Sequence, residues 1–176
     1  MSESGYRIRV AVRDDCPQIL NLVQELLTEI KLATSLVMTA AQLAEDGFPR
    51  HGPPAFTCHV AEPRDAPGQL VGICLHYVTY SAHVGRTAYL EDLYVVPAYR
   101  GHRLGARLMA ALADWARSHR CSRINFTLPD GNAMVRRFYW QLGAVDLTAD
   151  GWHLHRITGD ALSRLGDLYR PEGDEL

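Results

Sequence analysis

The segment from Tyr89 to Trp115 constrains the fold of this chain more than any other part. It reads as an apolar strand, a proline, a short turn rich in arginine and glycine, and then an amphipathic helix. A helix that follows such a turn leaves its first backbone N–H groups unpaired at its positive end. Because Arg100 and Arg103 lie in the turn, the segment predicts an anion site, such as one for a phosphate. An ordinary helix-initiating loop with solvated arginines is the plainer alternative.

Two carboxylates, Glu91 and Asp92, precede this turn on the expected strand. Neighbouring residues of a regular strand point to opposite faces, so we expect that the two side chains cannot reach the same spot. Glu91 is the candidate proton acceptor, and Asp92 is a candidate for substrate contact or for a pair with an arginine. A phosphate site beside acidic groups indicates a cofactor with a phosphate tail and a cationic substrate.

Hydrophobic periodicity predicts an α+β fold with the element order β-α-α-β-β-β-α-β-α-β. Strands are expected at 6–12, 56–62, 70–80, 87–95, 123–128 and 152–157, and helices at 15–30, 39–47, 104–118 and 133–142. The three middle strands would form an antiparallel meander. A parallel crossover after the third of them would make the sheet mixed.

Several residues are typical of helix ends. Asp15 with Gln18 and Thr39 with Gln42 both match a capping box at the start of a helix. Gly47 is placed where a C-terminal glycine would end the helix 39–47.

Length and composition indicate one ordinary domain over 1–170 with a flexible tail at 171–176. The formal net charge of -2 gives no general affinity for nucleic acid. No apolar run is long enough to span a bilayer and the first residues do not resemble a signal peptide, so we expect no membrane partner. The four scattered cysteines favour reduced thiols and a cytoplasmic location.

The histidines do not indicate a metal site. His153 and His155 would share a strand face, which is compatible with a metal, but no third ligand is evident. We therefore expect no metal.

The segment VPAYRGHRLGARLM resembles the acyl-CoA-binding signature of the GNAT superfamily of N-acetyltransferases, Arg/Gln-x-x-Gly-x-Gly/Ala. The segments DCPQIL, LAEDGF, YLEDLYVVPAYRG, FYWQLGAVDL and GWHLH are most similar to the diamine (spermidine/spermine) and thialysine acetyltransferase subfamily. The likeness runs from about Ile8 to Leu165. It implies the GNAT acyl-CoA N-acyltransferase fold, with a central mixed and splayed β-sheet flanked by helices, and an enzyme that uses acetyl-CoA.

The resemblance also implies a set of cofactor contacts. They are Leu93, Tyr94, Val95, Arg100, Gly101, His102, Arg103, Leu104, Gly105, Ala106, Asn132, Ala133, Met134, Val135 and Tyr139. Arg103 replaces the middle glycine of the signature, where its side chain could crowd the pyrophosphate or point outward and add a charged contact. Because Gly101 and Gly105 persist, we expect CoA binding to be retained.

Tyr139 occupies the position of the family's general acid, and Glu91 that of a carboxylate for the substrate amine. A primary amine with a pKa near ~10.4 is almost entirely protonated at pH 7, so acetyl transfer needs a group that removes a proton. Judged by spacing alone, Tyr139 would be a core aromatic of its amphipathic helix.

The substrate contacts that the resemblance implies are Glu29, Ser81, Glu91, Asp92, Asn125, Phe126, Thr127, Asp150 and Trp152. Where the polyamine enzymes carry a Tyr-Glu pair, this chain has Glu29-Ile30. In the hairpin loop, Ser81 and His83 replace an Asp and a Trp of the polyamine enzymes. Asp150 replaces a family Glu. Losing acids weakens a long polycation more than a short amine. We therefore expect a small primary amine (a diamine, or a thialysine-like or amino-acid-like amine), with polyamines second.

Two other functions stay open. The chain could be a catalytically idle acyl-CoA-binding module, and peptide or protein N-acetylation is a third reading. The third is disfavoured because the helix 39–47 would, by family resemblance, narrow the substrate cleft. The resemblance also implies a homodimer, with the last strand and the region after Gly143 at its interface.

Overall fold

A computed structural model describes residues 5–32 and 36–167 of the chain. They fall into two compact units, Met1–Pro129 and Asp130–Leu176, which are described separately below. The single domain expected over 1–170 stays a prediction, and the tail expected at 171–176 lies outside the described residues.

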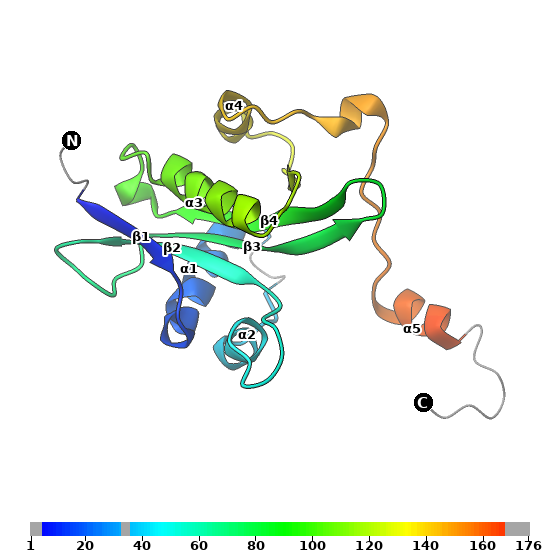
Figure 1. Ribbon diagram of the computed structural model, residues 1–176, viewed down its shortest axis with the longest axis horizontal. Helices are drawn as coiled ribbons and strands as arrows, with labels where there is room; N and C mark the ends of the chain where they lie inside the picture. Colours follow the sequence, from blue (N-terminus) through cyan, green and yellow to red (C-terminus); the bar gives the residue numbers. More distant parts are fainter. Residues whose placement is uncertain (1–4, 33–35, 168–176) are drawn as a thin grey trace. The chain divides into compact units, whose positions relative to one another are not determined.

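The first unit is built on a five-stranded sheet in the order β1-β2-β3-β4-β5 (Figure 1). The strands are β1 Tyr6–Val10, β2 Thr57–Pro63, β3 Gly72–Ser81, β4 Gly85–Val95 and β5 Ile124–Asn125. β1 to β4 pair antiparallel and β5 joins β4 in parallel. The predicted meander, parallel crossover and mixed sheet are therefore confirmed.

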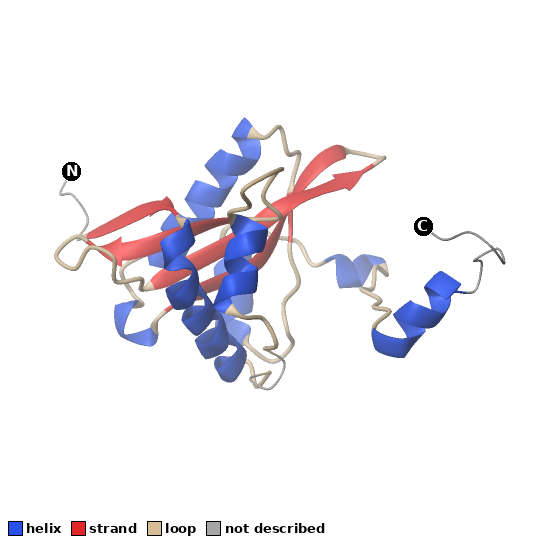
Figure 2. Ribbon diagram, turned by 90° about the horizontal axis from the view of Figure 1, so that it is seen from below, coloured by secondary structure: helices blue, strands red, loops and turns tan. Residues whose placement is uncertain are grey.

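Helices cover both faces of this sheet. α1 (Cys16–Glu29) and α2 (Ala40–Gly47) lie on one face, and α3 (Leu104–Ser118) lies on the other (Figures 1 and 2). Short 3-10 helices, Arg13–Asp15 and Pro97–Tyr99, precede α1 and α3. The apolar face of α3 buries Leu104, Leu108 and Leu112 against the sheet, so α3 is fixed by packing at the position that the sequence predicted.

The start of α1 differs from the expected capping box. The Asp15 carboxylate accepts from the Val12 N–H at 2.8 Å and from Arg9 at 2.6 Å, and not from the first turn of α1. Gln18 instead donates to the Gly68 carbonyl and accepts from the Leu70 N–H. The prediction was wrong because both polar side chains bond to the sheet and its loop in place of their own helix.

The second predicted capping box is confirmed. Thr39 accepts from the Gln42 N–H at 3.2 Å, and the Gln42 side chain accepts from the Thr39 N–H at 3.0 Å. The helix ends at Gly47, as predicted, but Gly47 is its last helical residue and lacks the positive φ of a C-terminal glycine that follows a helix. A Cβ on Gly47 would lie 2.4 Å from the Phe56 ring, so this glycine permits close packing.

The second unit consists of helices and irregular backbone. It contains α4 Ala133–Gln141, the 3-10 helix Leu147–Asp150 and α5 Gly159–Asp167. The strand predicted at 152–157 is wrong: the segment has no ladder partner among the described residues, and a strand needs one. Its apolar side chains are exposed, with Trp152 at 74% and Leu154 at 70%. No helix in the described ranges 5–32 and 36–167 is long and apolar enough to cross a membrane.

Candidate active site

The pairing of β4 with β3 shifts by one residue where the two carboxylates lie. Leu75 pairs with Asp92 and His76 with Leu90, which leaves Glu91 as the extra residue of a β-bulge. On β3, Leu75 and Tyr77 share a face, and Tyr77 pairs with Tyr89. Asp92 and Tyr89 therefore share a face although they lie three residues apart.

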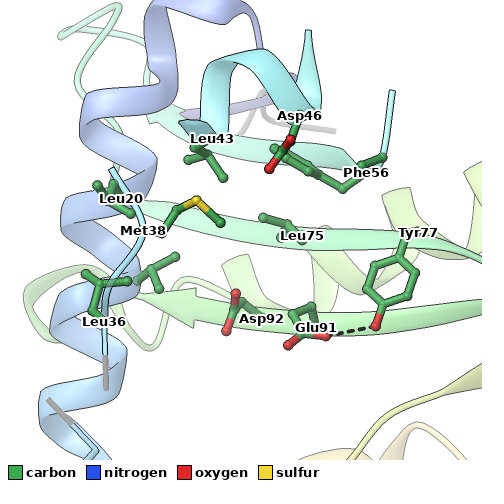
Figure 3. A pocket seen from close by; sticks show the side chains of 12 residues that line it. Leu20, Leu36, Met38, Leu43, Asp46, Phe56, Leu75, Tyr77, Glu91 and Asp92 are labelled. Atoms are coloured by element: carbon green, nitrogen blue, oxygen red, sulfur yellow. Dashed lines mark hydrogen bonds between the residues drawn. The ribbon is translucent and has the colours of Figure 1, made fainter. Parts of the chain in front are cut away.

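Glu91 points to the same face as Asp92. The Tyr77 hydroxyl donates a hydrogen bond of 3.1 Å to the Glu91 carboxylate, and Tyr77 stacks on Tyr89 with ring centroids 5.4 Å apart. Figure 3 shows both carboxylates directed into one pocket. The expectation that the two acids cannot reach the same spot is wrong, because the bulge breaks the alternation on which it rested.

This pocket has a volume of about 370 Å³ and lies on the face of the sheet that α1 and α2 cover. α1, α2 and the segments beside α2 supply most of its wall, and β3 and β4 supply the rest (Figure 3). Its lining residues are Leu20, Val23, Leu36, Met38, Leu43, Asp46, Ala55, Phe56, Leu75, Tyr77, Glu91 and Asp92. The pocket thus joins an apolar wall to an acidic pair.

Burial and the charge of Glu91 raise the pKa of Asp92 to about 6. Burial, followed by the charge of Glu91, raises the pKa of Tyr77 to about 12, so the Tyr77 hydroxyl stays protonated and donates to the carboxylate. A carboxylate whose pKa lies within about one unit of neutrality can both accept and release a proton at physiological pH. The acidic end of the pocket is therefore suited to receive an ammonium group and take its proton.

β4 continues past its parallel neighbour. β5 pairs only with Ala88 and Tyr89, while β4 extends to Val95. Beyond Tyr89 the β5 side of the strand has no partner strand in the part of the chain that the structure describes. The splayed sheet expected from the resemblance corresponds to this short β4–β5 pairing.

The exposed edge of β4 presents specific backbone groups. The Val96 N–H donates to the Val71 carbonyl at 3.0 Å, so this peptide faces β3. Because strand peptides alternate in direction, the N–H groups of Leu93 and Val95 face the side that β5 leaves. Arg100 Nε donates to the Val95 carbonyl at 2.9 Å, which agrees with this direction.

The predicted anion loop lies between β4 and α3. Gly101 has a φ of 86° and Arg103 a φ of 60°, which is a left-handed conformation. Glycine adopts this conformation at no steric cost, whereas a residue with a Cβ adopts it at a cost of about 1–2 kcal/mol. The replacement of the signature glycine by Arg103 therefore strains the backbone. The side chain is exposed at the N-cap of α3.

Arg100, an expected cofactor contact, pairs with another predicted site residue. Its guanidinium forms two hydrogen bonds with the Glu29 carboxylate, at 3.1 and 2.6 Å, and lies over the Tyr94 ring. Glu29 was expected to contact the substrate, and Arg100 the cofactor. The structure pairs them with each other at the C-terminal end of α1.

Other predicted substrate residues of the first unit lie around the β3–β4 hairpin. Ser81 ends β3 and accepts from the His83 N–H at 3.3 Å, at the hairpin tip. Asn125 pairs with Tyr89, and the Thr127 hydroxyl lies 3.3 Å from the Tyr89 hydroxyl. Phe126, between them, is half-buried. None of these residues lines the pocket described above.

The remaining predicted site residues belong to the second unit. Asn132 caps α4 by accepting from the Val135 N–H at 3.1 Å, and Ala133 and Met134 form the first turn. Tyr139 is buried on α4 and its ring packs edge-on against Phe138. Asp150 ends the 3-10 helix and is exposed, as is Trp152. The cofactor role of Asn132 and its neighbours stays a prediction.

Sequence reasoning missed the apolar wall and Tyr77. Leu20, Met38, Leu43 and Phe56 carry the ordinary signal of core residues, and no pattern separates a pocket wall from a packed core. Tyr77 was in principle detectable, because it lies in a strand paired with the one that carries the acids. In the described ranges 5–32 and 36–167, no group of three or more His, Cys, Asp or Glu side chains is arranged to hold a metal ion.

Comparisons with known proteins place this geometry among acetyltransferases. The profile of the Acetyltransferase (GNAT) family matches residues 21–144. A thialysine N-epsilon-acetyltransferase from Bos taurus is 39% identical over 164 residues, which cover 90% of this chain and 95% of the relative. The spermidine/spermine N(1)-acetyltransferase-like protein 1 of Homo sapiens is 36% identical over 162 residues, which cover 89% of this chain and 23% of that protein. An integron cassette protein from the mobile metagenome of V. cholerae has a similar fold, with a TM-score of 0.72 at 21% identity over 93% of this chain and 99% of its own.

Proposed function

This chain belongs to the GNAT family of acetyltransferases, and we propose that it carries an acetyl group from acetyl-CoA to the primary amine of a small molecule bound beside Glu91 and Asp92. It is an N-acetyltransferase. The single observation that carries the proposal is the β-bulge, which brings two carboxylates into one pocket next to an open strand edge.

The chain offers suitable groups for acetyl-CoA. The first N–H groups of α3, beginning at Leu104, have no partner within their own helix and suit the oxygens of a pyrophosphate. The Leu93 and Val95 N–H groups face an open edge, where they can bond the amide arm of the cofactor and polarise a thioester carbonyl. Bound acetyl-CoA supplies the activated acetyl group.

The acidic pair prepares the amine. Glu91 is exposed, so it can take a proton from the substrate ammonium and return it to water. Asp92 is half-buried, with a pKa of about 6, and holds the ammonium by its charge. The neutral amine then attacks the thioester carbon. Tyr139 is the proposed donor that protonates the departing CoA thiolate.

The homodimer and the cytoplasmic location are also proposals. Val145, Trp152 and Leu154 of the second unit are each at least 70% exposed, and a second copy of the chain would bury them. The mass in solution, measured by sedimentation equilibrium, tests the dimer. All four cysteines are free thiols, which supports a reducing compartment.

Thiol release from acetyl-CoA, measured with a panel of small amines, tests the function. We expect turnover with at least one small primary amine. Replacing Tyr139→Phe should lower kcat by about 10²–10⁴-fold and leave cofactor binding nearly unchanged. Tyr80→Phe is the matched control, because Tyr80 is 77% exposed and outside the site.

Two results would contradict the proposal. Calorimetry that detects no association between the folded protein and CoA would overturn it altogether. Protection by CoA against thermal unfolding, without turnover of any amine, would instead support the idle acyl-CoA-binding module.

A further inference from the structure

Glu91 occupies a position at which the sheet does not fix its side chain. It is the extra residue of the β-bulge, so it has no partner opposite it on β3. The residue is also exposed, and an exposed glutamate samples many rotamers. A proton acceptor has to meet the substrate ammonium in one geometry, because a misplacement of about 1 Å costs a large part of the rate. A contact outside the strand ladder is therefore needed to orient the Glu91 carboxylate.

The Tyr77 hydroxyl supplies such a contact. It donates a hydrogen bond of 3.1 Å to Glu91 Oε2, and within residues 5–32 and 36–167 no other hydrogen bond or ion pair reaches that carboxylate. Tyr77 reaches it on the diagonal of the strand pair, because Tyr77 lies opposite Tyr89, two residues before Glu91. The bond occupies Oε2 and leaves the lone pairs of Oε1 available to a ligand in the pocket.

The donor is itself held in place. Tyr77 and Tyr89 lie directly opposite each other, and their rings stack with centroids 5.4 Å apart and an angle of 28° between the ring planes. The Tyr89 hydroxyl lies 3.3 Å from the Thr127 hydroxyl, which links the stack to the segment after β5. A half-buried, stacked ring has few rotamers, so the Tyr77 hydroxyl is presented at a fixed point beside the pocket.

From these contacts we propose that Tyr77 is a positioning residue of the acetyl transfer. Its hydroxyl holds the Glu91 carboxylate, through Oε2, in the orientation and the ionised form that accept a proton from the substrate ammonium. The inference rests on the proposed function, because it concerns the proton acceptor of the same reaction. Tyr77 acts through Glu91 and takes no proton itself.

The charges around Glu91 show why a donor is needed there. Asp92 follows it and faces the same pocket, and Asp46 of α2 lies at the opposite end (Figure 3). α1 contributes only apolar side chains, and none of the described lining residues is a lysine, arginine or histidine. Two carboxylates in one pocket oppose each other's ionisation, and a hydrogen bond to one of them favours its charged form. The Tyr77 hydroxyl therefore offsets a repulsion that no lining cation offsets.

Tyr77 remains a donor at neutral pH. Burial, followed by the charge of Glu91, raises the pKa of Tyr77 to about 12, and Tyr89 and Asp92 add smaller contributions in the same direction. A hydroxyl with this pKa keeps its proton under physiological conditions. Tyr77 therefore cannot replace Glu91 as the proton acceptor, which separates the roles of the two residues.

The substitution Tyr77→Phe tests the proposal, because it removes the hydroxyl and keeps the stacked ring. Thiol release from acetyl-CoA is measured with the fastest acceptor of the amine panel, thialysine and spermidine included. At about pH 7.5 we expect kcat to fall by about 10- to 30-fold and KM for acetyl-CoA to change by less than about twofold. Tyr80→Phe, on the same strand and 77% exposed, is the matched control and should leave both values within about twofold. Thermal melting checks that both variants are folded.

A pH profile separates positioning from packing. Without the Tyr77 hydroxyl, the ionised carboxylate loses its donor and the acidic pair binds a proton at higher pH. The acid limb of kcat/KM should therefore move upward by about 0.5–1 pH unit in Tyr77→Phe and stay in place in Tyr80→Phe. A fall in kcat with an unmoved acid limb would show that Tyr77 only packs beside the pocket, and it would overturn the proposal.

A double-mutant cycle tests whether Tyr77 acts through Glu91. Glu91→Gln alone should lower kcat by about 10²-fold or more. Adding Tyr77→Phe should lower it by less than about twofold further, because the acceptor that the hydroxyl orients is gone. Losses that multiply, or an unchanged kcat in Tyr77→Phe, would overturn this inference and leave the acetyltransferase proposal intact. Turnover of no amine by the wild type would instead count against the proposed function, and against this inference with it.

Discussion

The two faces of the sheet in the first unit use their residues in opposite ways. On the α3 face, Leu108, Leu112 and His76 are completely buried and fill the space under the helix. On the α1/α2 face, packing is interrupted by a pocket of about 370 Å³ that is lined by three carboxylates. One face of the sheet is therefore closely packed throughout, whereas the other combines a buried core, which includes Ile19 and Ile73, with a pocket suited to chemistry.

The two faces also treat charge differently. His59 Nδ1 lies 3.0 Å from His76 Nε2 under α3, and His76 Nδ1 has no hydrogen-bond partner among the residues that the structure describes. Burial, and then the neighbouring His59, lowers the pKa of His76 to about 3, so this pair is held neutral. On the opposite face Asp92 keeps its charge at neutral pH, beside a second acid.

The largest expected difference is in the cost of removing a side chain packed under α3 and one that lines the pocket. Leu108→Ala should lower the free energy of unfolding by about 2–5 kcal/mol, because it leaves a cavity between α3 and the sheet. Met38→Ala should cost less than about 1 kcal/mol, because the side chain is already 40% exposed beside a pocket. Urea unfolding at pH 7 measures both values. Equal costs would show that the pocket wall at Met38 is as tightly packed as the space under α3.

The second prediction is a difference in pH dependence. The pKa of Asp92 is about 6 in the folded chain, above its ordinary 3.8, so the folded state binds the proton first and acidification from pH 6 to 4 stabilises it. The pKa of His76 is about 3, below its ordinary 6.5, so the unfolded state binds the proton first and acidification through the same range destabilises the fold. Each group contributes ~1.4 kcal/mol per pH unit, with opposite signs.

Two variants separate these contributions. On acidification from about pH 6 to 4.5, the free energy of unfolding of Asp92→Asn should fall more steeply than that of the wild type. The free energy of unfolding of His76→Leu should fall less steeply than that of the wild type. Urea titrations at several pH values give the slopes. If the slope of the free energy of unfolding against pH were the same in both variants as in the wild type, neither Asp92 nor His76 would have the shifted pKa described above.

The smallest expected effect concerns Glu29, at the end of α1. Its ion pair with Arg100 is about 40% exposed on both sides, and pairs of this kind contribute about 0.2–1 kcal/mol. If Arg100 also binds the cofactor pyrophosphate, Glu29 competes for it, and Glu29→Gln should tighten CoA binding by up to about fivefold. Calorimetry measures the change, with Glu45→Gln, a distant exposed partner of Arg13, as the control. Weaker CoA binding in Glu29→Gln would show that the pair positions Arg100 for the cofactor.

Most of the fold could be predicted because it follows local rules. The period of the apolar residues in α3 and the Thr39–Gln42 capping box each specify an element without reference to the rest of the chain. The prediction of a strand at 152–157 was wrong because alternating apolar and polar residues are typical of a half-buried strand but do not guarantee a neighbouring strand to pair with. The role of Gly47 was misread because this glycine makes room for the Phe56 ring, nine positions later.

The candidate site was predictable in its residue types and not in its geometry. Glu91 and Asp92 are visible as acids on a strand, but nothing in the neighbouring sequence signals a bulge, which depends on how β3 pairs with β4 between Leu75 and His76. Likewise Glu29 and Arg100 lie 71 residues apart, and only the packing of α1 beside β4 brings them together. Contacts between residues so far apart in the sequence depend on the tertiary structure, and they cannot be predicted from local sequence patterns.

The bulge at Glu91 has a consequence for how β4 can vary. Tyr94 on one side of it and Tyr89 on the other both face the α1/α2 side, so an even number of residues separates them, where a regular strand would require an odd number. Substituting any of these residues leaves that parity intact. Deleting or inserting one residue in the interval would turn Asp92 or Tyr89 toward the leucines of α3. A library that varies chain length here should lose folded members far faster than one that varies side chains.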